Sequence, residues 1–257
     1  NPDQTITEDQ VLDHYSREEV ISYGKQVAWN QLWRNFCVSD TFEPGSPSKI
    51  LTVAAGLEEG ILKGNEYFDC GGYLHVGDWD IKCTAYRRGG HGSLSLTESI
   101  MQSCNVAMMR IGAMMGRDIF TKYQTIFGMG QKTGVDLPGE ADAAGLVYSA
   151  DKMGPTELAT NAFGQNYNCT MIQMAAALCS VINGGSYYEP HVVRQILNEQ
   201  GSVVERKDPV LVRETVSQST SDFLKEAMFQ TVENGTGGAA KVAGYQVGGK
   251  TGTAEKQ

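Results

Sequence analysis

The segment at residues 242–253, VAGYQVGGKTGT, constrains the fold more than any other part of the chain. Its first part, residues 242–249, is typical of a β-strand, and a strand with exposed edges is not stable by itself. The glycine pair within it lets a ligand or another chain approach the backbone closely. One ammonium and two hydroxyl groups follow, carried by Lys250, Thr251 and Thr253. We therefore expect a strand edge that receives an extended, anionic ligand.

Composition places the chain among globular proteins. Its 257 residues, 41% hydrophobic and 20% charged, suffice for one large domain or two small ones. The net charge of -9 argues against nucleic-acid binding, which needs a basic face to neutralise phosphates. No run approaches 18 consecutive apolar residues, and the first ten residues are polar, so we expect neither a membrane span nor a signal peptide in this chain.

Periodicity and glycine positions predict a mostly helical chain with glycine-rich joints. Helices are expected at 8–34 (TITEDQ resembling a capped start), after a Pro/Gly-broken loop within 41–62, and at 95–116, 117–128, 155–183 and 217–233. At the second of these, Ser46 is a good N-cap and Pro47 fits the first helical position. Small hairpins or an irregular insertion are expected at 66–92, a loop at 143–154, and a β-hairpin at 187–207.

The first candidate motif is Ser46-Pro-Ser-Lys49, in FEPGSPSK. A serine hydroxyl is a poor nucleophile until a base takes its proton. Residues three apart share one face of a helix, so the Lys49 amine can reach the Ser46 hydroxyl. A lysine kept neutral by burial or by neighbouring cations can act as that base. The same spacing also fits a helix cap beside a surface lysine, so the pair alone does not establish catalysis.

Two further motifs follow in the chain. Ser103-Cys104-Asn105, in ESIMQSCNVA, puts a hydroxyl and an amide two residues apart, one able to relay a proton and the other to hold a substrate amide. The third motif, Lys250-Thr-Gly-Thr253, follows the predicted strand and its two glycines. Neither motif is specific by itself, and their order along the chain carries the information.

In this order the motifs resemble S-x-x-K, S-x-N and K-T-G of the serine acyltransferases that react with penicillin. The surrounding segments are similar to class B penicillin-binding proteins, the monofunctional transpeptidases of cell division, elongation and sporulation, with the division and sporulation type favoured. These segments cover nearly the whole chain: RNFCVSDTFEPGSPSK, LTESIMQSCNVAMM, TGVDLPGE, NAFGQNYNCTMIQMAAALCSVINGG and VGGKTGTAEK.

The resemblance implies a role for each motif residue. Ser46 attacks the penultimate D-alanine of a peptidoglycan stem peptide and forms an acyl-enzyme, while Lys49 accepts the serine proton. Ser103 relays a proton to the leaving group, helped by both motif lysines, and Asn105 binds the substrate amide. The terminal carboxylate is held by Lys250, Thr251, Gly252 and Thr253. An amine on a neighbouring stem then takes the acyl group, whereas a β-lactam leaves the serine blocked. The backbone N–H groups of Ser46 and Thr253 form the oxyanion hole.

The resemblance also implies an α/β (α+β) fold, the penicillin-binding protein and serine β-lactamase-like transpeptidase fold. Residues 1–257 are expected to hold an incomplete transpeptidase domain, mostly its helical part with the K-T-G strand at 242–257, while the remaining sheet strands lie outside this chain. The implied location is the extracytoplasmic face of the bacterial membrane, with an anchoring segment outside this chain, beside a polymerase of glycan strands. Pro47 and Ser48 depart from the family's common Thr and Phe, and Ser48 is expected to loosen local packing.

The insertion at 66–92 and its surroundings carry thiols and an imidazole. Cys70, Cys83, His91 and Cys104, with 12, 7 and 12 residues between them, supply the ligand types of a tetrahedral zinc site. Some class B relatives are similar here, with cysteines ahead of a GGHG segment and a structural zinc. A Cys70–Cys83 disulfide and free thiols remain the alternatives. Because serine chemistry needs no metal, no cofactor is required. Cys169 and Cys179, in an apolar helical pattern, predict buried thiols.

Two rival functions remain. A β-lactamase or penicillin-sensing domain of the same superfamily also carries S-x-x-K and K-T-G, but we find no counterpart of the glutamate that activates the deacylating water in class A β-lactamases. A non-catalytic cell-wall scaffold is the second rival. Intact motif residues disfavour it, and labelling by a penicillin distinguishes the alternatives.

Overall fold

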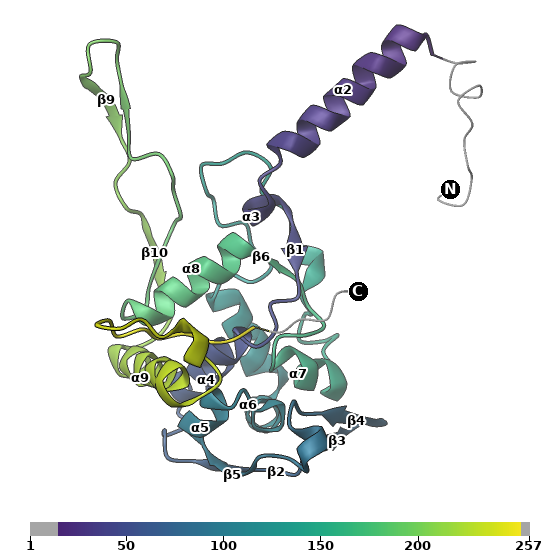
Figure 1. Ribbon diagram of the computed structural model, residues 1–257, viewed down its shortest axis with the longest axis vertical. Helices are drawn as coiled ribbons and strands as arrows, with labels where there is room; N and C mark the ends of the chain where they lie inside the picture. The colour runs from purple at the N-terminus through teal and green to yellow at the C-terminus, as the bar shows by residue number, and fades with distance from the viewer. Residues whose placement is uncertain (1–14, 253–257) are drawn as a thin grey trace.

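The computed structural model describes residues 15–252 (Figure 1). The helices in this range are α2 (Arg17–Trp33), α3 (Phe36–Ser39), α4 (Ser48–Glu58), α5 (Leu96–Met101), α6 (Asn105–Ile126), α7 (Pro155–Asn161), α8 (Met171–Ile182) and α9 (Gln218–Asn234). Single 3-10 turns are η1 (Tyr86–Arg88), η2 (Ala144–Leu146) and η3 (Gly238–Ala240). The strands are β1 (Thr41–Phe42), β2 (Tyr67–Cys70), β3 (Tyr73–Val76), β4 (Trp79–Lys82), β5 (Gly92–Ser95), β6 (Cys169–Thr170), β7 (Ser186–Tyr188), β8 (Gln195–Leu197), β9 (Val203–Arg206) and β10 (Leu211–Glu214).

The described strands form five antiparallel pairs: β1–β6, β2–β5, β3–β4, β7–β10 and β8–β9. These small sheets lie around a helical body, which confirms the mixed α/β class. The small hairpins expected at 66–92 are confirmed in β2 to β5. The hairpin expected at 187–207 is confirmed only from residue 195 onward, as β8–β9, because residues 187–188 belong to β7 and pair with β10. Within residues 15–252, no helix is long and apolar enough to span a membrane.

Helix α4 lies at the centre of the body, against α6, α8 and α9 (Figure 1). Every residue from 48 to 56 is buried. A helix that is apolar around its whole circumference belongs in a core, and ILTVAAG has that composition. Ile50 and Val53 are fully buried, and each contributes about 1.5–3 kcal/mol relative to an exposed position. The residues at the start of this helix are therefore held by core packing.

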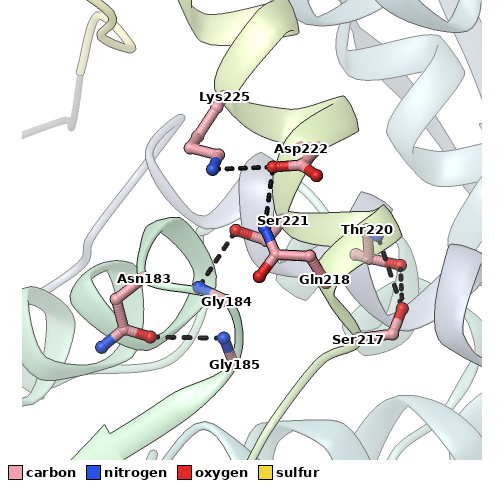
Figure 2. Close-up of polar contacts among 9 residues, drawn as sticks. All are labelled: Asn183, Gly184, Gly185, Ser217, Gln218, Thr220, Ser221, Asp222 and Lys225. Carbon is pink, nitrogen blue, oxygen red and sulfur yellow. Dashed lines mark hydrogen bonds and ion pairs between the residues drawn. The ribbon is translucent and has the colours of Figure 1, made fainter.

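The turn after α8 is tied to the start of α9 (Figure 2). Ser217 caps α9, because its hydroxyl accepts the Thr220 N–H. The Ser221 hydroxyl accepts the Gly184 N–H at 3.2 Å, one turn into the same helix. These bonds satisfy backbone groups at helix ends, which otherwise lack partners. The start of α9 is thus attached to the turn after α8, and both helices lie against α4.

Two segments extend away from the body: α2 and the β8–β9 hairpin (Figure 1). Helix α2 has no buried residue and confirms the expected helix within 8–34. The expected capped start TITEDQ lies outside the described residues. The β8–β9 strands are exposed along their length.

The expected β-strand at 242–249 is wrong for the described residues. This segment is irregular, and Gly249 donates its N–H to the carbonyl of Met228 on α9 at 3.1 Å. A strand is defined by a hydrogen-bonded neighbour, and within residues 15–252 none lies beside this segment. It follows α9 instead of a sheet.

The single helix expected at 155–183 is also wrong. Residues 162–170 separate α7 from α8, and Asn166 has a positive φ of 64° that breaks the helical path. The segment ends in β6, which pairs with β1. Cys169 is buried in that strand as expected, but Cys179 is exposed. Apolar periodicity did not reveal this break.

We expect Gly164→Ala to lower the free energy of unfolding by more than about 3 kcal/mol in urea denaturation. Gly164 has a φ of 92°, and an added Cβ would lie 1.9 Å from the carbonyl oxygen of Gly45. Gly201 has a φ of 80° and open space around it, so Gly201→Ala serves as the control for backbone strain alone. Equal losses in the two variants would contradict the predicted close packing.

Candidate active site

The chain before α4 is anchored on the segment that separates α7 from α8. Gly45 donates its N–H to the Gly164 carbonyl at 2.7 Å. The expected N-cap role of Ser46 is wrong, because α4 begins at Ser48 with Pro47 as the capping residue and no side-chain cap. The Ser46 side chain instead lies 3.1 Å from the Ser103 hydroxyl, which donates to it. The serine hydroxyl is therefore available for chemistry.

Lys49 is fully buried and is the second residue of α4, three residues after Ser46. Its Nζ donates to the Ser103 carbonyl at 2.7 Å, to the Ser103 hydroxyl at 3.0 Å and to Asn105 Oδ1 at 2.7 Å. Burial, followed by the charge of Lys250, lowers the pKa of Lys49 to about 7. Near neutral pH, roughly half of this amine is therefore uncharged and able to accept a proton.

Ser103 connects the three motifs. It lies in the turn between α5 and α6 with a φ of 54°, a conformation that costs a non-glycine residue about 1–3 kcal/mol. Its hydroxyl contacts Ser46 and Lys49, and it accepts from Lys250 Nζ at 2.8 Å. Strained backbone of this kind persists where surrounding contacts determine it, and these contacts converge on one hydroxyl group.

Asn105 begins α6 and is engaged at both ends of its amide. Oδ1 accepts from Lys49, while Nδ2 donates to the carbonyl of Lys82 at 3.2 Å. The latter bond connects the site to the β3–β4 hairpin. A substrate amide would have to share or replace one of these partners.

The K-T-G residues approach the same hydroxyl from the end of the described chain. Burial lowers the pKa of Lys250 to about 8. Lys250 Nζ also lies 3.2 Å from Thr251 Oγ1, and Gly252 passes close to Pro47, at a distance where a Cβ would be in ordinary contact. Thr253 lies outside the described residues. All other predicted catalytic residues meet in one place.

Three cysteines and one histidine, from 70 to 104, form a second cluster beside this site. The potential ligand atoms of Cys70, Cys83, His91 and Cys104 all lie within 4.8 Å of one another. All six cysteines of the chain are free thiols in the structure, including Cys70 and Cys83.

The spacings inside this Cys/His cluster suit a tetrahedral metal. Zinc bonded to sulfur and nitrogen at ordinary lengths places two sulfurs about 3.8 Å apart and a sulfur and nitrogen about 3.6 Å apart. The Cys83 and Cys104 sulfurs are 3.9 Å apart, and His91 Nδ1 lies 3.5 Å from Cys70 Sγ and 3.6 Å from Cys83 Sγ. The donor set and its dimensions therefore fit Zn²⁺.

One thiol of the cluster already has the character of a metal ligand. The Cys104 thiol donates to Cys83 Sγ, and the Asn105 N–H also points to it at 3.3 Å. These hydrogen bonds lower the pKa of Cys83 to about 3, and the same contact with Cys83 raises the pKa of Cys104. Metal ligation requires the thiolate form, which Cys83 is prepared to supply.

Ser48 has a partner that sequence reasoning missed. Its hydroxyl lies 2.7 Å from the hydroxyl of Tyr167, and both side chains are buried. Burial raises the pKa of Tyr167, which keeps the phenol neutral. Ser48 therefore does not simply loosen packing, as expected, because it satisfies a buried phenol. The sequence feature that could have indicated this contact is the tyrosine in GQNYNCT, which lies in one of the segments similar to the family.

Comparison with known proteins now decides the family. The family described as penicillin binding protein transpeptidase domain matches residues 7–257. The chain belongs to this transpeptidase family. Stage V sporulation protein D of Bacillus subtilis is 39% identical over 226 residues, which cover 87% of this chain and 34% of that protein.

Solved structures agree with this assignment. The D,D-transpeptidase domain of a peptidoglycan glycosyltransferase from Eggerthella lenta aligns with a TM-score of 0.81 at 25% identity, covering 92% of this chain and 61% of that one. Penicillin binding protein 3 from Mycobacterium tuberculosis, complexed with ampicillin, aligns with a TM-score of 0.76 at 30% identity, covering 86% and 50%. The chain spans about a third of the length of the curated relatives it matches.

We expect Tyr167→Phe to lower the free energy of unfolding by about 1–3 kcal/mol, because the buried Ser48 hydroxyl loses its partner. The double variant Tyr167→Phe/Ser48→Ala lacks both hydroxyls. Its loss of unfolding free energy should be smaller than the sum of the losses in the two single variants. Urea denaturation of all four proteins measures this coupling. Strict additivity would contradict the hydrogen bond.

Proposed function

We propose that this transpeptidase-family chain provides the acyl-transfer site of a serine D,D-transpeptidase that cross-links peptidoglycan stem peptides. The observation that carries the proposal is the buried Lys49 amine, which hydrogen-bonds Ser103 and Asn105 beside Ser46. A base of suitable pKa next to a hydroxyl is what an activated serine requires.

The proposed reaction has two acyl transfers. Ser46 Oγ bonds to the penultimate D-alanine carbonyl carbon, and the bond from that carbon to the terminal D-alanine nitrogen breaks. Lys49 takes the hydroxyl proton, and Ser103 relays a proton to the leaving amine. An amine of a second stem peptide then bonds to the carbonyl carbon, the serine ester breaks, and a proton returns to Ser46 Oγ.

The remaining motif residues bind substrate in this proposal. Asn105 exchanges one of its two amide contacts for the substrate amide, and Lys250 with Thr251 and Gly252 receives the terminal carboxylate. The extended peptide lies along the 242–252 segment, which is irregular in the described residues. Thr253 and the backbone N–H of Ser46 complete the carboxylate site and the oxyanion hole. β-Lactams acylate the same serine as substrate mimics, in keeping with the ampicillin complex of the relative from Mycobacterium tuberculosis.

The whole protein is proposed to work on the extracytoplasmic face of the cell membrane, where peptidoglycan lies, beside a polymerase of glycan strands. The name of the Bacillus subtilis relative supports a sporulation role over a role in elongation. A hydrolase of the same superfamily is the second candidate function, since it would share the Ser46, Lys49 and Lys250 arrangement.

Incubation with a penicillin should add the mass of one intact β-lactam to the protein, because ring opening leaves the drug esterified to Ser46. The adduct should be absent in Ser46→Ala and present in the control Ser219→Ala, which removes an exposed hydroxyl on α9. Intact mass spectrometry measures both. Labelling of Ser46→Ala would contradict the proposed nucleophile, and rapid loss of the wild-type adduct would favour the hydrolase.

We also propose that the Cys/His cluster holds a structural Zn²⁺, ligated by Cys70, Cys83, His91 and Cys104. The support is the donor set, its tetrahedral spacings and its burial. When bound, the ion would supply structural cross-linking rather than acyl-transfer chemistry. Cys104 occupies the middle of the S-x-N motif, so its ligation would fix the backbone between Ser103 and Asn105.

Native mass spectrometry of reduced protein should find one zinc per chain. His91→Ala should lower the zinc affinity by at least about tenfold, because one of four ligands is lost. His191→Ala is the matched control, since His191 is exposed and outside the cluster. Absence of zinc from wild-type protein would contradict the metal site. A titration of denatured protein in the presence of a chelator that finds fewer than the six thiols of the sequence would contradict it as well.

A further inference from the structure

The loop that follows α9, residues 235–238, connects two of the motifs. Thr236 donates its backbone N–H to the Met101 carbonyl at 3.1 Å, and its hydroxyl donates to the same oxygen at 3.0 Å. Met101 is the last residue of α5, two positions before Ser103. The loop is therefore attached to the turn that presents the S-x-N motif.

The same Thr236 hydroxyl lies 3.1 Å from the hydroxyl of Thr251. A hydroxyl can donate one hydrogen bond, and the Thr236 hydroxyl donates it to the Met101 carbonyl. The Thr251 hydroxyl must therefore donate to Thr236, while it accepts from Lys250 Nζ at 3.2 Å. Thr236 orients the hydroxyl of the K-T-G motif in the absence of ligand.

Glycines on either side of Thr236 make this approach possible. A Cβ at Gly235 would lie 2.8 Å from the Met101 carbonyl oxygen, and a Cβ at Gly237 would lie 3.1 Å from the Thr231 carbonyl oxygen. Side chains at these positions would push the loop off α5 and α9. Thr236 itself is exposed, and its hydroxyl lies beside that of Thr251, a residue proposed to bind the substrate.

We propose that Thr236 supplies a further hydroxyl to the binding site for the substrate's terminal carboxylate. This inference rests on the proposed function. An incoming carboxylate accepts a hydrogen bond from the Thr251 hydroxyl, and the Thr236 hydroxyl turns from Met101 to donate a second hydrogen bond to the anion. The Met101 carbonyl keeps the Thr236 N–H, so the turn leaves no buried group unpaired. Within residues 15–252, no acidic side chain pairs with Lys250, so the charge of that ammonium is not neutralised by a carboxylate of the described chain.

The test compares acylation by a penicillin with acylation by its methyl ester, which lacks the anionic carboxylate. Thr236→Val keeps the shape of the side chain but removes the hydroxyl. It should slow acylation by the acid at least about tenfold and leave the rate with the ester unchanged, because hydrogen bonds to charged groups are the strong ones. The ratio of the acylation rate with the acid to the acylation rate with the ester should therefore fall by the same factor.

Two further variants keep the experiment specific. Thr236→Ser restores a hydroxyl and should restore the wild-type ratio. Thr125→Val, a matched change at an exposed position of α6, should leave both rates at their wild-type values. A Thr236→Val variant that slows acid and ester equally has lost only a structural contact, and one that slows neither shows no role; either result overturns the inference. A wild-type protein that penicillin does not acylate overturns the proposed function itself.

Discussion

The burial of Lys49 is the interaction on which the candidate site depends. The lysine pKa falls from 10.5 to about 7, so protonating this amine in the folded protein is about 5 kcal/mol harder than in water. The folded state tolerates the group because three oxygen atoms, from Ser103 and Asn105, surround Nζ. Those oxygens are in place because Ser103 adopts a positive φ and because α4 is packed into the core.

The elements around α4 hold this arrangement from different directions. The Gly45–Gly164 contact fixes the approach to Ser46, and the β3–β4 hairpin reaches Asn105 through the Lys82 carbonyl. The Cys/His cluster lies directly behind Ser103, because Cys104 is its neighbour in the chain. The proposed zinc site and the proposed acyl-transfer site therefore depend on the same short turn between α5 and α6. We expect a change in zinc ligation to alter the positions of Ser103 and Asn105.

Much of this site could be predicted from the sequence. Ser46 and Lys49 lie three residues apart, and this spacing predicted that their side chains share one region. In the structure the Ser103 hydroxyl joins the two side chains. The family resemblance joined them to Ser103, Asn105 and Lys250. In the structure Ser46, Lys49 and Lys250 contact the Ser103 hydroxyl, and Asn105 contacts Lys49. The sequence also predicted which cysteines and histidine form the Cys/His cluster. Their irregular spacing did not distinguish a zinc site from a disulfide or free thiols.

The remaining features depend on long-range contacts that no local pattern reveals. Residues 242–249 have the composition of a strand, but pairing decides strand formation, and the described part of the chain provides this segment with α9 as its neighbour. The helical pattern is interrupted at 162–170, where the chain forms β6 and pairs with β1. The Ser48–Tyr167 bond and the second amide contact of Asn105 join residues far apart in sequence.

The pH dependence of acylation tests the central claim most directly. If a buried Lys49 activates Ser46, the second-order rate constant for a penicillin should rise between pH 5 and pH 8 with a midpoint near the Lys49 pKa of about 7. Stopped-flow mixing with a fluorescent penicillin gives this profile on wild-type protein. A midpoint near 10, the value of an ordinary lysine, would contradict the account, as would a rate that does not change with pH over this range.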